Sequence, residues 1–379
     1  MDTGLVAFTA GLVVFWAIVY VAFRGRRGRV EVGPGYLIVR AGIRLDPMEP
    51  GWWSLAWRVF GVVSLVLLVL SAVAFYYYAG KLFVLRYISP PPCAGSVAGF
   101  VPFIPGVTLS WKATVYIGVA LGIAALFHEL SHAYVARSVG VRVKDAGLAF
   151  FLFIPAAFVE PDEEELGRAR VRDRALVYSA GVGANVVLGL LFLALATSMV
   201  AGVVITGVDP GSPAAKANLT AGMEIIAVNG TKVDNVGDLV RVLSQLGAED
   251  PHRNVTLVFT VRQDDTVRNV TVYRPWNRTA GNCTRARIGI MISNKYWPSQ
   301  LLGVMSNILF LINISLAVVN AAPLVIPLPG GSILSDGAYV LRDSLAVLTG
   351  ERRAMILTLA VGVGTLLLVL SLLSFQRIM

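Results

Sequence analysis

Long apolar runs determine which folds are open to this chain of 379 residues. Hydrophobic residues make up 56% of the sequence and charged residues 15%, whereas roughly a quarter of the residues in a soluble domain are charged. A helix of about 20 apolar residues crosses a bilayer. Five runs have this length with little or no charge: Leu5–Phe23, Val59–Gly80, Ala113–Ala136, Ala175–Met199 and Ala354–Phe375. A sixth run, Leu301–Ala322, is also apolar but holds three asparagines. We therefore predict a polytopic α-helical membrane protein with about six transmembrane helices.

Arginines in short loops predict how these helices are oriented, because positive residues concentrate on the cytosolic side. Clusters follow the first run and precede the fourth and the last: Arg24, Arg26, Arg27 and Arg29; Arg168, Arg170, Arg172 and Arg174; Arg352 and Arg353. All three lie inside a cell membrane if the N-terminus lies outside. The first run is then a retained anchor rather than a signal peptide, since Asp2 precedes it and basic residues follow it. The net charge of +9 is a topology signal, so we expect contact with the lipid bilayer and no nucleic-acid partner.

The segment of residues 201–291 differs from the apolar runs on either side of it. It is more polar and rich in Val, Thr, Asn and Asp, and the predicted topology places it outside the cytosol. Six N-x-S/T triplets in it suggest an exported surface, although a Thr- and Asn-rich region also produces such triplets by chance: Asn218, Asn229, Asn254, Asn269, Asn277 and Asn282. We expect a separate extracytoplasmic domain here.

Two of the three histidines bracket a glutamate in the motif His128-Glu129-Leu130-Ser131-His132, inside an otherwise uncharged run. Residues four apart lie on one face of a helix, so both imidazoles can reach one metal ion while Glu129 points toward a water in the open position of that ion. Ionisable groups at membrane depth are costly and usually functional. The motif therefore favours one catalytic zinc ion, with Glu129 as the catalytic residue, over two solvated histidines on a surface helix.

A catalytic zinc ion usually has three protein ligands. The remaining histidine, His252, lies in the segment predicted to be outside the cytosol, so a carboxylate is expected. Residues Asn320–Gly337 form an apolar stretch broken by Pro and Gly, and such irregular backbone is tolerated at membrane depth where it lines a cavity. We predict Asp336 as the third ligand. A helix cap is the alternative role for Asp336, and Asp343 is the second candidate ligand.

These motifs together resemble the site-2 protease family of intramembrane zinc metalloproteases. The resemblance runs from about Val101 to Leu345 and rests on the metal motif, on residues 147–160 (GLAFFLFIPAAFVE), on residues 180–185 (AGVGAN) and on Asn320–Gly337. It implies hydrolysis of peptide bonds within the transmembrane segments of membrane-protein substrates, in regulated intramembrane proteolysis. One departure is that about eight extra residues separate N-x-x-P from D-G, and that Ser335 replaces the usual Leu. The position of His128 in its run predicts an active site toward the cytosolic side of the membrane.

The resemblance also implies roles for two asparagines and one short apolar segment. Asn185 and Asn320 would lie near the metal and bind the substrate backbone or an oxyanion, while amides that pack helices together are the alternative. Residues 146–159 are too few to span a bilayer and resemble a membrane-dipping β segment, which could pair with an unwound substrate.

Within residues 201–291, Gly211–Ala214 followed by Ala221–Gly230 resembles the PDZ domains of envelope proteases, with Met223 where Asp is usual. The resemblance implies an inserted extracytoplasmic PDZ-like α/β domain, in which Asp238–Leu246 is the helix beside a peptide groove. Such domains bind an extended peptide or a C-terminus by strand addition, here expected along Val203, Val204 and Ile205. A size filter without a specific ligand is the alternative.

Four segments follow: 1–100, an N-terminal transmembrane hairpin with a cytosolic and an external loop; 101–200, the first half of the protease core; 201–291, the PDZ-like domain; and 299–379, the second half of the core with the last transmembrane helix. Cys93 and Cys283 are both predicted outside, where they form a disulfide or remain two free thiols. The alternative functions are a non-catalytic PDZ-containing membrane scaffold and a metal transporter, neither of which needs Glu129.

Overall fold

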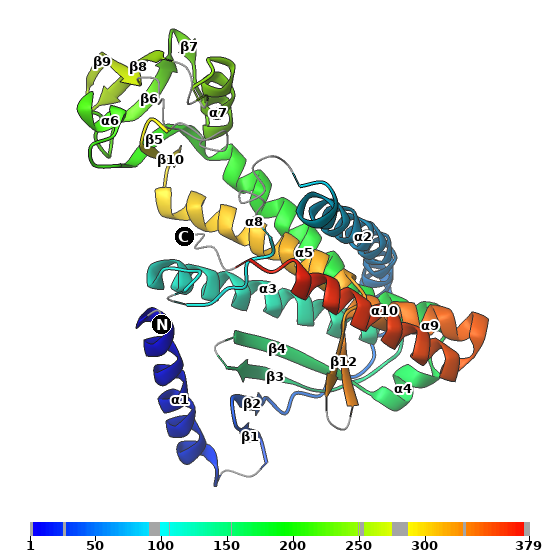
Figure 1. Cartoon of the computed structure of the whole chain (residues 1–379). Coiled ribbons are helices and arrows are strands. Elements are labelled where there is room, and N and C mark those ends of the chain that lie inside the picture. Colours follow the sequence, from blue (N-terminus) through cyan, green and yellow to red (C-terminus); the bar gives the residue numbers. More distant parts are fainter. Residues whose placement is uncertain are drawn as a thin grey trace. The chain divides into compact units, whose positions relative to one another are not determined.

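The computed structural model describes residues 3–25, 28–90, 99–105, 107–152, 154–248, 250, 254–274, 287–328 and 331–374 (Figure 1). The chain divides into two compact units: a helical unit of Met1–Ser89, Ser96–Phe192 and Ile308–Met379, and an insert unit of Pro90–Gly95 and Leu193–Asn307. The predicted domain of residues 201–291 lies within the insert unit. His252, Cys93, Cys283, Asn277 and Asn282 lie outside the described residues, so the proposed disulfide stays a prediction.

Within the described residues, five helices are long and apolar enough to cross a membrane, as expected for a multi-pass membrane protein: Trp52–Ile88, Trp111–Ser138, Val171–Ser198, Gln300–Ala321 and Glu351–Ser371. They are α2 (Trp52–Phe83) with its π-helical end η1 (Val84–Ile88), α3 (Trp111–Ser138), α5 (Val171–Ser198), α8 (Gln300–Ala321) and α10 (Glu351–Ser371). Five of the six predicted runs are thus confirmed as long apolar helices. The first run forms α1 (Thr3–Phe23), of which Thr9–Phe23 is a shorter apolar helix, so a sixth span stays a prediction.

Burial along α2 differs from that in a helix of a soluble protein. Most of its buried residues are small, with Ser64 fully buried and Ser71 only 8% exposed, and Leu68 and Phe75 are the large residues buried with them. Large apolar residues face outward, with Val66 57% and Val73 62% exposed. Small residues let membrane helices approach closely, because no apolar side chain needs shelter from lipid. At Gly183 of α5 an added Cβ would lie 2.8 Å from the Cα of Ser64, so α2 and α5 meet at this glycine.

A four-stranded antiparallel sheet lies beside α3 in the order β1 (Val30–Gly33), β2 (Tyr36–Arg40), β3 (Val143–Phe151), β4 (Ile154–Pro161) (Figure 1). The segment predicted to dip into the membrane as β structure, residues 146–159, forms most of a hairpin of β3 and β4. The loop after α1 contributes β2, which pairs with β3. The sequence of residues 30–40 did not predict this pairing. Among the described strands, β4 is an edge of this sheet.

Acidic residues at the end of β4 and directly after it have structural roles. Asp162 caps α4 (Glu163–Arg168) by accepting hydrogen bonds from the backbone N–H groups of Glu164 and Glu165. The backbone N–H of Glu165, followed by the Lys144 ammonium and the Glu164 N–H, lowers the pKa of Asp162 against the opposing effect of desolvation. Glu160 pairs with Arg40 at 2.6 Å, which connects β4 to β2.

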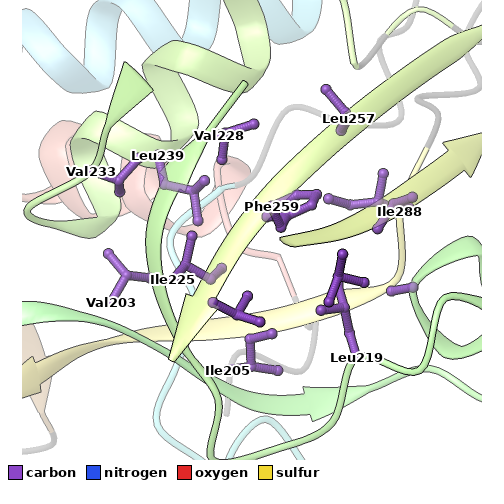
Figure 2. Packing of buried hydrophobic residues seen from close by; sticks show 14 of the residues in the cluster. Val203, Ile205, Leu219, Ile225, Val228, Val233, Leu239, Leu257, Phe259 and Ile288 are labelled. Atoms are coloured by element: carbon purple, nitrogen blue, oxygen red, sulfur yellow. The ribbon is translucent and has the colours of Figure 1, made fainter. Parts of the chain in front are cut away.

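The insert unit is built around one antiparallel sheet and two helices. The sheet order is β10 (Ile290–Tyr296), β5 (Val200–Val208), β6 (Glu224–Val228), β8 (Val255–Gln263), β9 (Thr266–Arg274), with β7 (Thr231–Lys232) paired to β6. The helices are α6 (Pro213–Lys216) and α7 (Val236–Gln245), and α7 coincides with the helix predicted at residues 238–246. Its Leu239 packs with Ile225 and Phe259 in the core (Figure 2). Met223 is 1% exposed in the same core, so apolar packing explains why Met replaces the usual Asp.

The structure differs from the predicted peptide groove along Val203, Val204 and Ile205. These residues lie in β5, which pairs with β6 on one side, and all three pair with β10 on the other. Because both edges of β5 are already hydrogen-bonded, no strand can add to it there. Among the described strands, the edge next to β5 belongs to β10.

Replacing Gly183 by Ala should destabilise the helical unit, because the new methyl group overlaps Ser64. Overpacking of this kind costs about 1–3 kcal/mol. Thermal unfolding in detergent measures the effect, with Gly118→Ala as the control, since a Cβ at Gly118 of α3 meets no described atom within 4 Å. Equal unfolding midpoints for the two variants would contradict the close approach of α2 and α5.

Candidate metal centre

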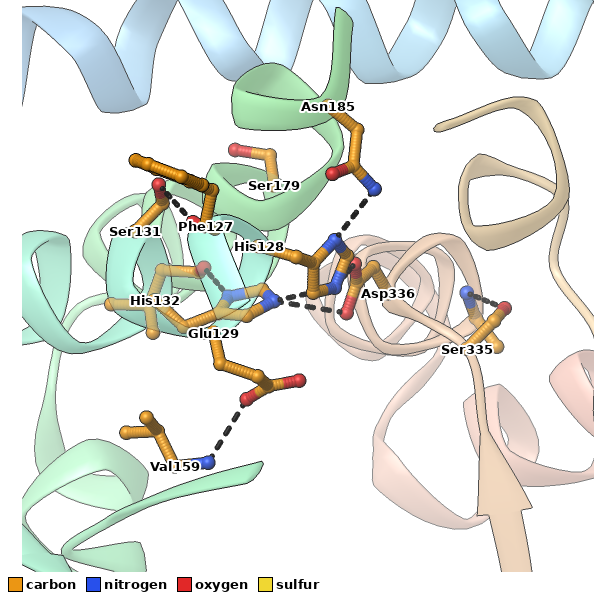
Figure 3. Close-up of polar contacts among 12 residues, drawn as sticks. Phe127, His128, Glu129, Ser131, His132, Val159, Ser179, Asn185, Ser335 and Asp336 are labelled. Carbon is orange, nitrogen blue, oxygen red and sulfur yellow. Dashed lines mark hydrogen bonds and ion pairs between the residues drawn. The ribbon is translucent and has the colours of Figure 1, made fainter. Parts of the chain in front are cut away.

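Helix α3 carries the motif predicted to bind metal. The helix begins at an N-cap, Ser110, whose side chain accepts a hydrogen bond from Ala113 N. It continues without interruption through His128, Glu129 and His132, because its apolar residues face both lipid and neighbouring helices. The one-turn spacing places the Nε2 atoms of the two imidazoles 3.2 Å apart (Figure 3).

Asp336 joins the two histidines from the start of α9 (Asp336–Thr349). Its Oδ2 lies 3.3 Å from His128 Nε2, and its Oδ1 lies 3.6 Å from His132 Nε2. Ser335 is the N-cap of α9, so capping does not occupy the Asp336 side chain. The other candidate, Asp343, instead accepts hydrogen bonds from Arg174 and Arg342. Of the two predicted carboxylates, the structure brings only Asp336 to the histidines.

The three side chains fit a zinc ion. Tetrahedral zinc with bonds of about 2.0–2.2 Å requires ligand atoms roughly 3.3–3.5 Å apart, close to the observed separations. Asp336 Oδ2 is buried and has no hydrogen-bond donor among the described residues. Gly181 of α5 leaves space at the same place, because an added Cβ would overlap the rings of both His128 and His132. The two imidazole nitrogens with the carboxylate, the Asp336 Oδ2 atom that has no described hydrogen-bond donor, and the space beside Gly181 together match a metal site.

Helix α5 contacts the opposite nitrogens of both imidazoles. His132 Nδ1 lies 2.7 Å from the carbonyl oxygen of Val177, so this nitrogen donates its proton and Nε2 is left to bind metal. Asn185 Nδ2 lies 3.1 Å from His128 Nδ1. A half-turn of the amide would place Oδ1, which has no described partner, as the acceptor for the Nδ1 proton of a metal-bound ring.

The two predicted asparagines therefore have different surroundings. Asn185 is fully buried and lies on the far side of His128 from Glu129 (Figure 3). Asn320 lines a cavity of about 820 Å³ together with His128, Glu129, His132, Val159 and Asp336. Direct contact with a substrate in this cavity is open to Asn320, whereas Asn185 is placed to hold a ligand ring.

Glu129 points to the edge strand of the sheet. Its Oε2 accepts a hydrogen bond of 2.9 Å from the backbone N–H of Val159 in β4 (Figure 3). This contact orients the carboxylate beside the histidines and places the edge of β4 at the cavity. Val159 N, Val177 O and Gly181 were not singled out for these roles in the sequence. Only Gly181 left a signal, as a small residue in the AGVGAN segment.

The extra residues before Asp336 form a hairpin of β11 (Val325–Leu328) and β12 (Gly331–Leu334). Ser335 closes the base of this hairpin. Its hydroxyl donates to Ala322 O at 2.6 Å and accepts from Leu324 N at 3.0 Å, and its N–H donates to Leu324 O. Because the two ends of the insertion are joined by these bonds, the added length does not displace Asp336.

Comparison with known proteins agrees with this site. The chain is 27% identical over 248 residues to an uncharacterized protein of Methanocaldococcus jannaschii, covering 63% of each chain. It is 28% identical over 213 residues to a protein of Brucella suis biovar 1 named "Putative zinc metalloprotease", covering 54% of this chain and 50% of that one. The chain thus spans less than two thirds of the length of both relatives. Residues 116–369, which include both histidines and Asp336, match peptidase family M50. The chain therefore belongs to peptidase family M50, the family of the site-2 proteases.

Proposed function

We propose that this membrane metalloprotease hydrolyses peptide bonds within the transmembrane segments of other membrane proteins, with one zinc ion bound by His128, His132 and Asp336. The observation that carries the proposal is the convergence of these ligands, Glu129 and a strand edge on one cavity in a unit of long apolar helices. A non-catalytic scaffold would need neither Glu129 nor this cavity. A metal transporter would not need Glu129 to contact a strand edge.

Glu129 is the group placed to move protons in the reaction. A zinc ion held by the three ligands would lower the pKa of a water molecule and polarise the carbonyl oxygen of the scissile bond. Glu129 takes a proton from the attacking water and returns it to the leaving amine. Asn320, which lines the cavity, would donate its amide N–H to the developing oxyanion or to the substrate backbone.

The edge of β4 is the proposed binding surface for the substrate. Backbone groups of alternate residues leave a strand on the same edge, so Ala157 N–H faces the same side as Val159 N–H, which contacts Glu129. A substrate helix hides its carbonyls in its own hydrogen bonds and must unwind before it can pair with Ala157. Helix-breaking residues in the substrate should therefore favour cleavage.

Replacing Glu129 by Gln should abolish cleavage of a transmembrane substrate while zinc stays bound, because the amide cannot accept the proton but leaves all three ligands in place. The expected loss is at least about 100-fold. Peptide cleavage in detergent and zinc content measured on the same sample separate the two effects. Glu164→Gln on the exposed helix α4 is the matched control and should retain activity. Equal cleavage by wild type and Glu129→Gln would refute the proposed mechanism.

We further propose that the insert unit is a PDZ-like domain outside the cytosol and that it binds an extended peptide along β10. Its β5–α6–β6–β7–α7–β8–β9–β10 order supports the PDZ-like fold. Peptide binding along β10 is supported by the sheet order, in which β5 is the one described strand beside β10, while the Gln300 side chain bonds the backbone of Asn294 and Tyr296 at the end of β10. The four described acceptor sites, Asn218, Asn229, Asn254 and Asn269, are all exposed, as glycosylation of an exported surface requires.

Hydrogen exchange of the full-length protein with a peptide library bearing free C-termini tests the choice of strand. Amides of β10 should gain protection when a peptide binds, since strand addition gives them partners. Amides of Val203–Ile205 should be protected already in the absence of peptide, because both edges of β5 are paired. Protection appearing at β5 alone would contradict the assignment, and no protection anywhere would favour a size filter.

A further inference from the structure

Helix α5 contributes no metal ligand, yet it contacts the element that carries each one. Asn185 and the Val177 carbonyl touch the imidazoles of His128 and His132 on α3. Toward α9, which carries Asp336 at its first position, α5 presents Tyr178 and Arg174. The third ligand is therefore held indirectly, through contacts further along its own helix.

The strongest of these contacts is an ion pair. Arg174 Nε donates to Asp343 Oδ2 at 2.6 Å. Asp343 is 3% exposed, and it lies seven residues after Asp336, on the same face of α9. The Arg174 Nη1 also donates to Gly167 O of α4 at 3.0 Å, which connects the ion pair to α4. A buried carboxylate requires such partners, because water cannot solvate it.

A second contact lies between the ion pair and the metal ligands. The rings of Tyr178 and Tyr339 stack with centroids 4.9 Å apart and an interplanar angle of 18°. Along α9 the order is Asp336, Tyr339, Asp343, while along α5 it is Gly181, Tyr178, Arg174. The two helices thus meet at successive turns, with the ion pair farthest from the metal site.

Asp343 also accepts a hydrogen bond of 2.9 Å from Arg342 Nε. Arg342 precedes Asp343 on α9, so this bond neutralises the carboxylate without joining α9 to another helix. Arg174 and Arg342 are therefore two similar partners of the Asp343 carboxylate. Of these two arginines, Arg174 is the one that connects α9 to α5.

We propose that the Arg174–Asp343 ion pair is a positioning pair that holds Asp336 at bonding distance from the metal. This inference rests on the proposed function, because it takes Asp336 as the third ligand. It assigns a role to Asp343 that differs from that of a ligand. Loss of this ion pair leaves the Tyr178–Tyr339 stack to hold α9 against α5, so that α9 can shift relative to α3 and the distance between Asp336 and the two imidazoles changes.

The test compares zinc dissociation constants, measured by competition with a chelator, for Arg174→Gln and Arg342→Gln in the full-length protein in detergent. Arg174→Gln should weaken zinc binding roughly 10- to 100-fold, as loss of supporting residues around a metal site commonly does. Arg342→Gln should bind zinc like the wild type. The cobalt-substituted protein adds a second readout, since Arg174→Gln should alter its visible absorption spectrum and Arg342→Gln should not.

Arg174→Lys keeps the charge in case Arg174→Gln fails to fold, and it should restore part of the zinc affinity. Equal zinc affinity and equal cobalt spectra for the Arg174 and Arg342 variants would overturn the positioning role. Asp336→Asn distinguishes this result from failure of the proposed function. If Asp336→Asn binds zinc as tightly as the wild type, Asp336 is not a ligand and the metal site itself is wrong.

Discussion

Two imidazoles and a carboxylate that are largely withdrawn from water need polar partners from the protein, because burying a polar group without a partner is costly. The described structure supplies the partners of both imidazoles from one neighbouring helix. Helix α5 offers a carbonyl to His132, an amide to His128 and a glycine where both rings approach. It also connects through Arg174 to the helix that begins with Asp336. Helix α5 thus contacts both helices that carry the three candidate ligands.

The same requirement explains why a strand edge lies beside Glu129. An exposed strand edge in hydrocarbon would leave backbone groups unpaired, so it is tolerated only where it borders a cavity. Here the Val159 N–H is paired with Glu129, and the end of β4 at Val159–Pro161 lines a cavity of about 820 Å³. Under the proposed function, an unwound substrate would pair with this edge, which would partly offset the free energy needed to unwind it near Glu129.

Much of this site could be predicted from sequence, because local spacing fixes it. The four-residue separation of His128 and His132 on a helix determines that their rings meet, and the five long apolar helices follow from run length. The role of Asp336 as third ligand could be predicted because a catalytic zinc ion usually needs three protein ligands. The extra residues before Asp336 made its distance from the histidines uncertain. The hairpin of β11 and β12, closed by Ser335, removes that difficulty, and such closure depends on contacts that no local pattern encodes.

Tertiary contacts between distant residues account for what the sequence did not reveal. Nothing near Val203–Ile205 indicates that β10, some 90 residues later, covers that edge, and the sequence did not indicate that Asn185 faces a ligand ring rather than the cavity.

Zinc X-ray absorption of the purified protein tests the central claim most directly. The account predicts two imidazole nitrogens and carboxylate or water oxygens at about 2.0–2.2 Å, with one oxygen ligand altered in Asp336→Ala. A sulfur shell near about 2.3 Å, or fewer than two imidazoles, would contradict it.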